Sequence, residues 1–529
     1  MKLEVRGGKL YDPANQRNGV ARSLFVEDGA VLDPAPAGWK PERVIDATGC
    51  VVMPGGVDVH CHIAGPSVNR ARGLVGGDLA PSTFVTGYRY SALGYTTAVD
   101  AAVSPSGARQ CHLEFEDTPN IERGFLLAIA DHPLVVDAVR GRDRSALREI
   151  LAWLLARTGA LGLKAVNPLG TRRWRRGGAD VSSVEEEVEP GLSPRAVIET
   201  LADVAAALRL PHPLHVHCNR LGVPGNVETT IATLRALEGR RAHLAHLQFH
   251  AYGKTDSGEL SSGAVPLLDA LSRCPGVTAD VGQVVFGPAL TLSADGPLEH
   301  LLYRLTGSRY VNIESECEGG CGFVPLEYRP RSLVHAFQWA LGMELMLLNP
   351  DPWRLALSTD HPNGGSFLSY PRIIACLMSR ARRDEEAERA NPKAIDRTAL
   401  GARSERITRE YSLDEIAILT RAAPARMLGL SKKGHLGAGA DADITIYTDD
   451  ADRERMFASP RWVLQAGQVV IEDGELRAPT PGRTLRAAVE ADPGGERRFA
   501  TWFARHGSYH VSQFGLDRTA LDSMRAVER

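Results

Sequence analysis

Short apolar runs alternate with turn residues near both ends of the chain and with longer helical stretches between them. Before residue 50 the runs are separated by turns such as Gly7-Gly8 and Asp28-Gly29, and a similar stretch returns between residues 442 and 474. Short strands with frequent turns are typical of a small β-domain. We therefore expect residues 1–50 and 431–480 to form one composite β-domain.

The middle of the chain, residues 51–430, has the pattern of a parallel α/β fold, in which apolar strands alternate with helices. Eight candidate strands cover residues 57–62, 96–100, 125–130, 161–166, 214–217, 243–247, 277–281 and 355–360. Eight such strands predict a (β/α)8 TIM-like barrel, whose chemistry lies at the C-terminal strand ends. About 70 residues separate the last two strands, which predicts an insertion there. Residues 481–529 are charged and aromatic, and we expect a tail that docks on another surface.

Composition and charge narrow the class of protein. The 529 residues are 43% hydrophobic and 24% charged, enough for a large core and a second domain. A net charge of -3 gives no field that would attract nucleic acid or an anionic membrane. No apolar run approaches the ~18 residues of a membrane span. The start of the chain resembles a strand and not a signal peptide, and the 8 cysteines lack framework spacing. We therefore expect a cytoplasmic protein with reduced thiols.

Metal-binding residue types occur at the ends of several predicted strands. His60 and His62 lie two residues apart on the first strand, so both rings can face the same side. The other candidates are Lys164 on the fourth strand, His215 and His217 on the fifth, His243 and His246 on the sixth, and Asp360 on the eighth. A barrel would bring these positions to one mouth. Since neutral imidazole is a common zinc ligand, the pattern predicts a metal site.

Lys164 is the most unusual member of this set. A bare ammonium group inside an apolar strand is costly, and metal ions beside it would repel it. Carbamylation by CO2 removes both difficulties, because the side chain then carries a negative charge and two oxygens that can bridge two cations. We therefore predict a carboxylated Lys164.

Together these residues resemble the amidohydrolase superfamily, which includes dihydroorotase, hydantoinase and the large chain of urease. The resemblance implies two divalent metal ions, with zinc as the expected metal, and a C–N bond as the target of hydrolysis. It implies that Asp360 also moves the proton from water to the leaving nitrogen. The ligands that it implies are His60, His62, Lys164, His217, His246 and Asp360. His215, His243 and His250 stay open as rival ligands.

Longer motifs around these positions narrow the resemblance. They cover residues 60–65, 164–168, 217–226, 246–253 and 359–365, and they are similar to the A component of formylmethanofuran dehydrogenases and of bacterial formyltransferase/hydrolase complexes. The resemblance implies interconversion of N-formylmethanofuran, or a bacterial analogue of this polyanionic one-carbon carrier, with formate and the free amine. It also implies other subunits of such a complex as partners. Only 8 of the 61 basic residues are lysine, and this arginine-rich composition favours the bacterial, hydrolytic case.

Two other hypotheses stay open from the sequence. One is a stand-alone hydantoinase- or dihydroorotase-like hydrolase of a small amide. The other is a metal-free scaffold that only assembles other subunits.

Residues outside the predicted metal site are candidates for binding the carrier. Four arginines follow the fourth strand, and their guanidinium groups match the geometry of carboxylates; they are Arg172, Arg173, Arg175 and Arg176. Asn219 and Asn363 are further candidates for substrate binding. Cys317 and Cys321 have no second pair that would complete a four-ligand metal site, so a structural role is expected for them.

Overall fold

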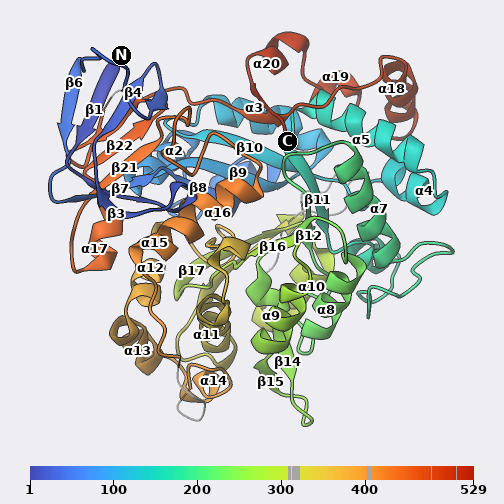
Figure 1. Cartoon of the computed structure of the whole chain (residues 1–529). Coiled ribbons are helices and arrows are strands. Elements are labelled where there is room, and N and C mark those ends of the chain that lie inside the picture. Colours follow the sequence, from blue (N-terminus) through green and yellow to red (C-terminus); the bar gives the residue numbers. More distant parts are fainter. Residues whose placement is uncertain (308–310, 313–321, 402–406, 478, 508) are drawn as a thin grey trace.

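Eight parallel strands form the central sheet of the computed structural model (Figure 1). Each strand pairs in parallel with its neighbour along the sheet. The ring closes where Cys61 and His361 form a parallel bridge and the His62 amide donates to the His361 carbonyl at 2.7 Å. The predicted TIM-like barrel is confirmed. Its strands are β8 (Gly56–Cys61), β9 (Tyr95–Val103), β10 (Glu122–Ala128), β11 (Gly162–Val166), β12 (Leu214–His217), β13 (Ala242–Leu244), β16 (Val277–Asp280) and β20 (Leu355–Ala356).

The structure describes residues 1–307, 311–312, 322–401, 407–477, 479–507 and 509–529. Cys317 and Cys321 lie outside these residues. Two barrel strands are shorter than the apolar pattern predicted. β13 stops at Leu244, because His246 has a left-handed φ of 35° and a 3-10 turn follows it. β20 stops at Ala356, before the chain reaches Asp360 with a φ of 49°.

The strands and the surrounding helices share one continuous apolar core. Leu127, Leu163, Val216 and Leu244 belong to it and are fully buried. Burying each such side chain stabilises the fold by about 1.5–3 kcal/mol. Capping residues mark the ends of several helices. Helix α5 (Arg144–Thr158), for example, begins where the Asp143 side chain accepts from the Ala146 amide and ends at Gly159, which has a left-handed φ of 65°.

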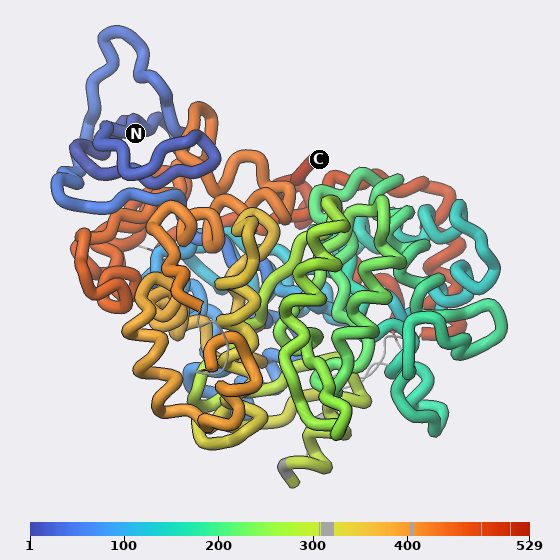
Figure 2. The backbone as a smooth tube through the Cα atoms, turned by 60° about the horizontal axis from the view of Figure 1, so that its bottom comes forward, coloured from blue at the N-terminus to red at the C-terminus, as the bar shows by residue number. Residues whose placement is uncertain are grey.

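Strands from both chain ends form a second part of the molecule. β7 (Cys50–Pro54) pairs with β21 (Ile444–Thr448) in antiparallel register within a seven-stranded sheet. A four-stranded sheet of β1 (Lys2–Arg6), β4 (Leu24–Glu27), β5 (Ala30–Leu32) and β6 (Arg43–Asp46) lies beside it. Figure 2 shows the blue N-terminal strands next to the orange segment near residue 450. The expected small β-domain from both chain ends is therefore present, and its exact limits stay a prediction.

The long connection between β16 and β20 contains an additional lobe. β17 (Gly287–Ser293) pairs with β19 (Gly322–Tyr328), which also pairs with β18 (Val311–Asn312), all antiparallel. Helix α10 (Gly296–Thr306) follows β17, and α11 (Leu333–Leu348) returns the chain to the barrel. This lobe places α10 over the barrel mouth, because leucines of α10 line the same cavity as the residues at the strand ends.

The C-terminal tail packs on its own barrel. Helix α18 (Gly495–His506) lies along α5, and the Trp153 indole donates to Glu496 at 2.6 Å (Figure 1). Near the chain end Arg525 pairs with Glu122 of β10 at 3.4 Å. The tail that we expected to dock on another surface thus has at least one docking surface within the same chain.

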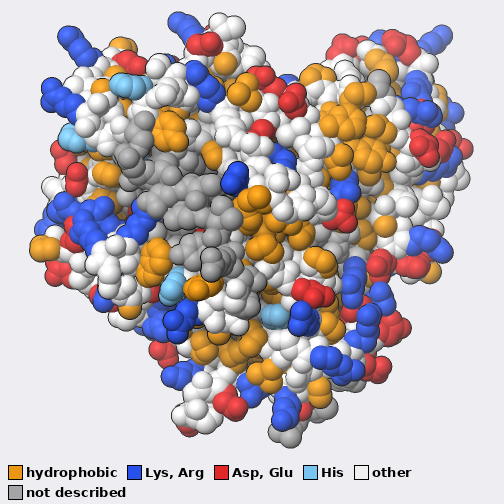
Figure 3. All heavy atoms as spheres, turned by 180° about the vertical axis from the view of Figure 1, so that it is seen from behind, with side chains coloured by type: hydrophobic (Ala, Val, Ile, Leu, Met, Phe, Trp, Pro, Cys, Tyr) orange, Lys and Arg blue, Asp and Glu red, His pale blue; other side chains and the backbone are white. Residues whose placement is uncertain are grey.

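Charged side chains of both signs are interspersed around the face seen in Figure 3, in agreement with the small net charge. Among the described residues, no helix combines the length and apolar character needed to cross a membrane.

Candidate metal centre

A cavity of about 800 Å³ opens at the C-terminal ends of the barrel strands. All six residues predicted to be metal ligands line it, and they come from five different strands or strand ends: His60, His62, Lys164, His217, His246 and Asp360. The structure therefore brings together side chains that are up to 300 residues apart in sequence.

One group of donors consists of His60, His62 and Asp360. The Nε2 atoms of both histidines lie 3.1 Å from the same Asp360 atom, Oδ1. Two donor atoms bound to one tetrahedral zinc ion, each at about 2.0–2.2 Å, are separated by about 3.3 Å. The three side chains therefore form one of the groups that could hold a metal ion.

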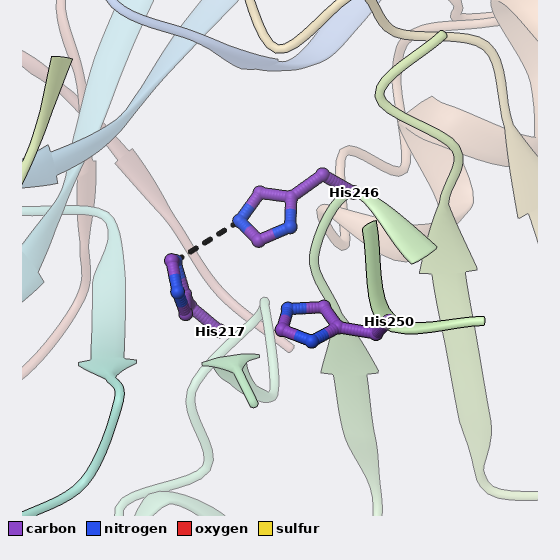
Figure 4. A group of neighbouring side chains, drawn as sticks. All are labelled: His217, His246 and His250. Carbon is purple, nitrogen blue, oxygen red and sulfur yellow. Dashed lines mark hydrogen bonds between the residues drawn. The ribbon is translucent and has the colours of Figure 1, made fainter. Parts of the chain in front are cut away.

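A second group consists of His217, His246 and His250, whose rings converge in Figure 4. His217 Nδ1 and His246 Nε2 are 3.1 Å apart, close to the separation expected for two ligands of one ion. Burial holds the pKa of each of these histidines well below its usual value. Neutral rings with free lone pairs are the form in which histidine binds metals.

Lys164 lines the cavity floor with His60, His62, His217, His246 and Asp360. Its side chain is 2% exposed, and its Nζ has no hydrogen-bond partner among the described residues. Burial lowers the pKa of Lys164 to about 8, although Asp280 and Asp360 oppose the shift. Roughly a tenth of the amine is then neutral at pH 7, which is the form that reacts with CO2. A buried amine without a hydrogen-bond partner, next to the neutral rings of His217 and His246, is compatible with the predicted carboxylation of Lys164.

A deeper layer supports His60. Its Nδ1 lies 2.9 Å from Asp280 Oδ2, and Asp280 Oδ1 accepts from the His246 amide at 3.0 Å. A carboxylate behind a ligating histidine fixes the ring orientation and tautomer. Asp280 is not among the residues predicted for the site, although its place at the end of the seventh strand was a usable signal.

The rival histidines of the fifth and sixth strands also lie in this deeper layer. His215 Nδ1 contacts His212 at 3.1 Å, and His243 Nε2 contacts Asp280 at 3.2 Å. Neither His215 nor His243 is among the residues that line the cavity. His250 does not line it either, and both of its ring nitrogens lack partners among the described residues.

The two asparagines predicted to bind substrate have different surroundings. Asn363 lines the cavity and donates to Asp360 Oδ1 at 3.0 Å. Asn219 is fully buried behind the cavity wall, where it donates to Asn167 Oδ1 at 2.6 Å and to the Pro168 carbonyl at 2.9 Å. The contacts of Asn219 are those of a residue that holds the loop after β11.

The four predicted arginines lie on or next to the short helix α6 (Gly170–Arg175), and none is among the cavity-lining residues. Arg172 donates to Glu189 at 2.7 Å, and Arg176 pairs with the same carboxylate. Arg173 pairs with Glu186. Much of the positive charge of this helix is therefore already balanced within the chain.

The upper wall of the cavity is apolar. Helix α10 contributes a row of leucines, and the inserted sheet and α11 add further aliphatic side chains; the residues are Leu298, Leu301, Leu302, Leu305, Leu326 and Val334. The cavity thus combines a polar, metal-ligand floor with an apolar wall, an arrangement common to small-molecule sites.

The sequence pattern of the amidohydrolase family matches residues 43–471 of this chain. The chain belongs to the amidohydrolase family. It is therefore a hydrolase by family membership, as the strand-end residues predicted. D-hydantoinase, at 16% identity with a TM-score of 0.51, shares the fold.

Closer relatives cover nearly the whole chain. The A component of the formyltransferase/hydrolase complex Fhc from Methylorubrum extorquens is 42% identical over 98% of this chain and 96% of its own length. Protein FwdA from Methanocaldococcus jannaschii is 39% identical over 93% of this chain and 91% of its own. The crystal structure of the FhcABCD complex from M. extorquens with methylofuran contains a chain that superposes with a TM-score of 0.94 over 100% of both chains. The predicted resemblance to the A component of such complexes is confirmed.

Proposed function

We propose that this chain is the catalytic A component of a formyltransferase/hydrolase complex, and that it hydrolyses an N-formylated, methanofuran-type carrier to formate and the free amine. The observation that carries the proposal is the 0.94 TM-score over the full chain to a chain of the methylofuran-bound complex. The cavity floor, which holds the full set of metal-ligand residue types, supports it. The partners are then the other subunits of the complex and the polyanionic one-carbon carrier.

We assign two divalent ions, zinc in each case, to the cavity floor. One would be held by His60, His62 and Asp360 and the other by His217 and His246, with a carboxylated Lys164 as a further ligand. When bound, such ions polarise a carbonyl and make water acidic enough to attack it at neutral pH.

Asp360 is the residue that we assign to proton transfer. Its Oδ1 contacts His60, His62 and Asn363, while its Oδ2 has no hydrogen bond among the described residues. Asp360 Oδ2 is therefore available to take a proton from water and to deliver it to the leaving nitrogen. Burial alone would raise the pKa of Asp360, but His60 and His62 hold it well below its usual value, so the side chain begins the cycle as a base.

The apolar wall is suited to the body of the carrier. The formyl group would reach the polar floor, while an apolar segment next to the amine would contact the leucines of α10. The hydrolytic direction is supported by the similarity to the Methylorubrum extorquens complex, whose name includes both formyl transfer and hydrolysis.

The decisive experiment measures formate released from N-formyl-methylofuran by the purified chain, alone and with its co-purifying subunits. Formate release that disappears after chelation and returns with zinc supports the proposal. Hydrolysis of hydantoin or dihydroorotate with no release from the formylated carrier would instead identify a stand-alone amide hydrolase. Absence of both activities in a stable complex without metal would identify a scaffold.

A further inference from the structure

A buried carboxylate of the inserted lobe, Asp295, contacts one of the candidate metal ligands. Asp295 Oδ2 lies 3.2 Å from Nε2 of His217, the ring nitrogen that does not face His246. Asp295 is 1% exposed and stands at the N-terminus of α10. It is thus one point at which the lobe over the cavity contacts the cavity floor.

The two oxygens of Asp295 have separate partners. Oδ1 accepts from the Asn167 side-chain amide at 2.9 Å and from the Leu298 backbone amide at 3.2 Å, which caps α10. Oδ2 is left for His217. Asn167 also holds the strand that carries His217, because its backbone amide donates to the His217 carbonyl at 2.9 Å.

This division of partners determines where the hydrogen on the His217 ring must lie. An ionised carboxylate can only accept, so Nε2 of the neutral ring carries the hydrogen. The lone pair is then on Nδ1, which lies 3.1 Å from His246 Nε2. That is the nitrogen that would bind the second metal ion.

We propose that Asp295 is a positioning residue that fixes His217 in the tautomer whose Nδ1 can bind a metal ion. The proposal rests on the metal centre assigned under the proposed function. It gives the inserted lobe a role in metal binding, in addition to forming the wall of the cavity.

Asp295→Asn separates this role from the capping of α10. Asparagine is as good an N-cap as aspartate, so the helix should be retained. Oδ1 must still accept from Asn167 and Leu298, so the new NH2 group takes the place of Oδ2 and faces His217 Nε2. The ring then avoids two opposed donors by moving its hydrogen to Nδ1, as happens when an asparagine replaces the aspartate behind a catalytic histidine.

The experiment measures metal affinity of the purified full-length chain by competition with a zinc chelator, together with the thermal midpoint of the metal-free protein. For Asp295→Asn we expect one of two zinc equivalents to bind about 10–100-fold more weakly, with a thermal midpoint close to wild type. Asp295→Ala should lower the midpoint as well, because it removes the cap.

Glu299→Gln is the matched control. Glu299 lies on the same helix, is 3% exposed, and has its pKa raised to about 9 by burial, so it is neutral at pH 7 and glutamine resembles it closely. It should bind both zinc ions as wild type does. If Asp295→Asn bound both zinc ions with wild-type affinity while Asp295→Ala had a lower thermal midpoint, Asp295 would act only as a helix cap. That result would overturn this inference but not the proposed metal centre. A wild-type protein that binds no zinc would overturn the metal centre and this inference together.

Discussion

Asp280→Asn tests how the deeper layer of the barrel holds the first group of metal ligands. Asp280 Oδ2 accepts from His60 Nδ1 at 2.9 Å and from His243 Nε2 at 3.2 Å. Oδ1 accepts from the Ser358 hydroxyl at 2.7 Å and from the His246 amide at 3.0 Å. Asparagine keeps only one acceptor oxygen, so its NH2 group would face two histidines that now donate to Oδ2.

The loss of stability in Asp280→Asn depends on which tautomers His60 and His243 can adopt. His243 can move its hydrogen to Nδ1, because the Thr278 hydroxyl at 2.9 Å can accept as well as donate. His60 can avoid the opposed donors only by moving its hydrogen from Nδ1 to Nε2, the atom that faces Asp360 and the assigned metal. We therefore expect the folded state to lose about 1–3 kcal/mol, because the hydrogen bonds that His60 and His243 make to an ionised carboxylate are replaced by weaker bonds to a neutral amide. Zinc affinity at the His60 side should fall about 10–100-fold.

Urea unfolding of the metal-free protein and chelator competition measure the two effects separately. Ser358→Ala is the control, because it removes one donor to Asp280 without changing the contacts of His60 or His243. It should leave zinc affinity unchanged. If Asp280→Asn bound both zinc ions with wild-type affinity, Asp280 would not orient His60 and the argument from the deeper layer would be wrong.

Three further changes test other parts of the site, and one tests the tail. Lys164→Ala should lose metal and activity, measured by zinc content and formate release, and a small added carboxylate should restore both in part. Full zinc content in the untreated variant would contradict the role of a carboxylated Lys164 as a metal ligand. Asp360→Asn should keep its fold but lose about 10²–10⁴ in kcat, and near-normal turnover would remove it from the mechanism. Replacing Arg172, Arg173, Arg175 and Arg176 tests whether their guanidinium groups bind the carboxylates of the carrier, although three of them already pair with Glu186 and Glu189. Carrier binding predicts a higher KM for the full carrier and an unchanged kcat, with an effect that shrinks as salt rises; an unchanged KM, or equal losses on a carrier without carboxylates, would contradict it. His132 packs against Trp502 of α18, and burial lowers the pKa of His132 from 6.5 to about 4. Between these pH values the unfolded chain binds more protons than the folded chain. The free energy of unfolding should therefore fall by about 3 kcal/mol as the pH falls from 6.5 towards 4. His132→Phe should remove that part of the acid sensitivity in thermal melts, and unchanged melts would show that His132 is not the responsible group.

The sequence predicted the barrel because eight short apolar runs alternate with helical stretches along residues 51–430. It also predicted the residues on the cavity floor, since the barrel brings all strand ends to one mouth. Its errors concern strand length. β13 stops two residues before the left-handed His246 and β20 stops four residues before the left-handed Asp360, and no apolar pattern signals such turns.

The supporting residues could not be predicted from the sequence in the same way. Asp295 reaches His217 only because the inserted lobe folds over the mouth, and the two positions are 78 residues apart. Asn219 follows a candidate ligand directly, yet the structure turns it towards Asn167 and away from the cavity. The pairing of Arg172 and Arg176 with Glu189 likewise depends on the path of a loop, which carries no periodic signal.

The most direct test of the central claim is a high-resolution crystal structure of the zinc-loaded protein, with anomalous data at the zinc edge. We predict two anomalous peaks, one bounded by His60, His62 and Asp360 and the other by His217 and His246, with carboxylate density on Lys164 between them. A bare Lys164 amine, or a single peak away from these side chains, would contradict the account.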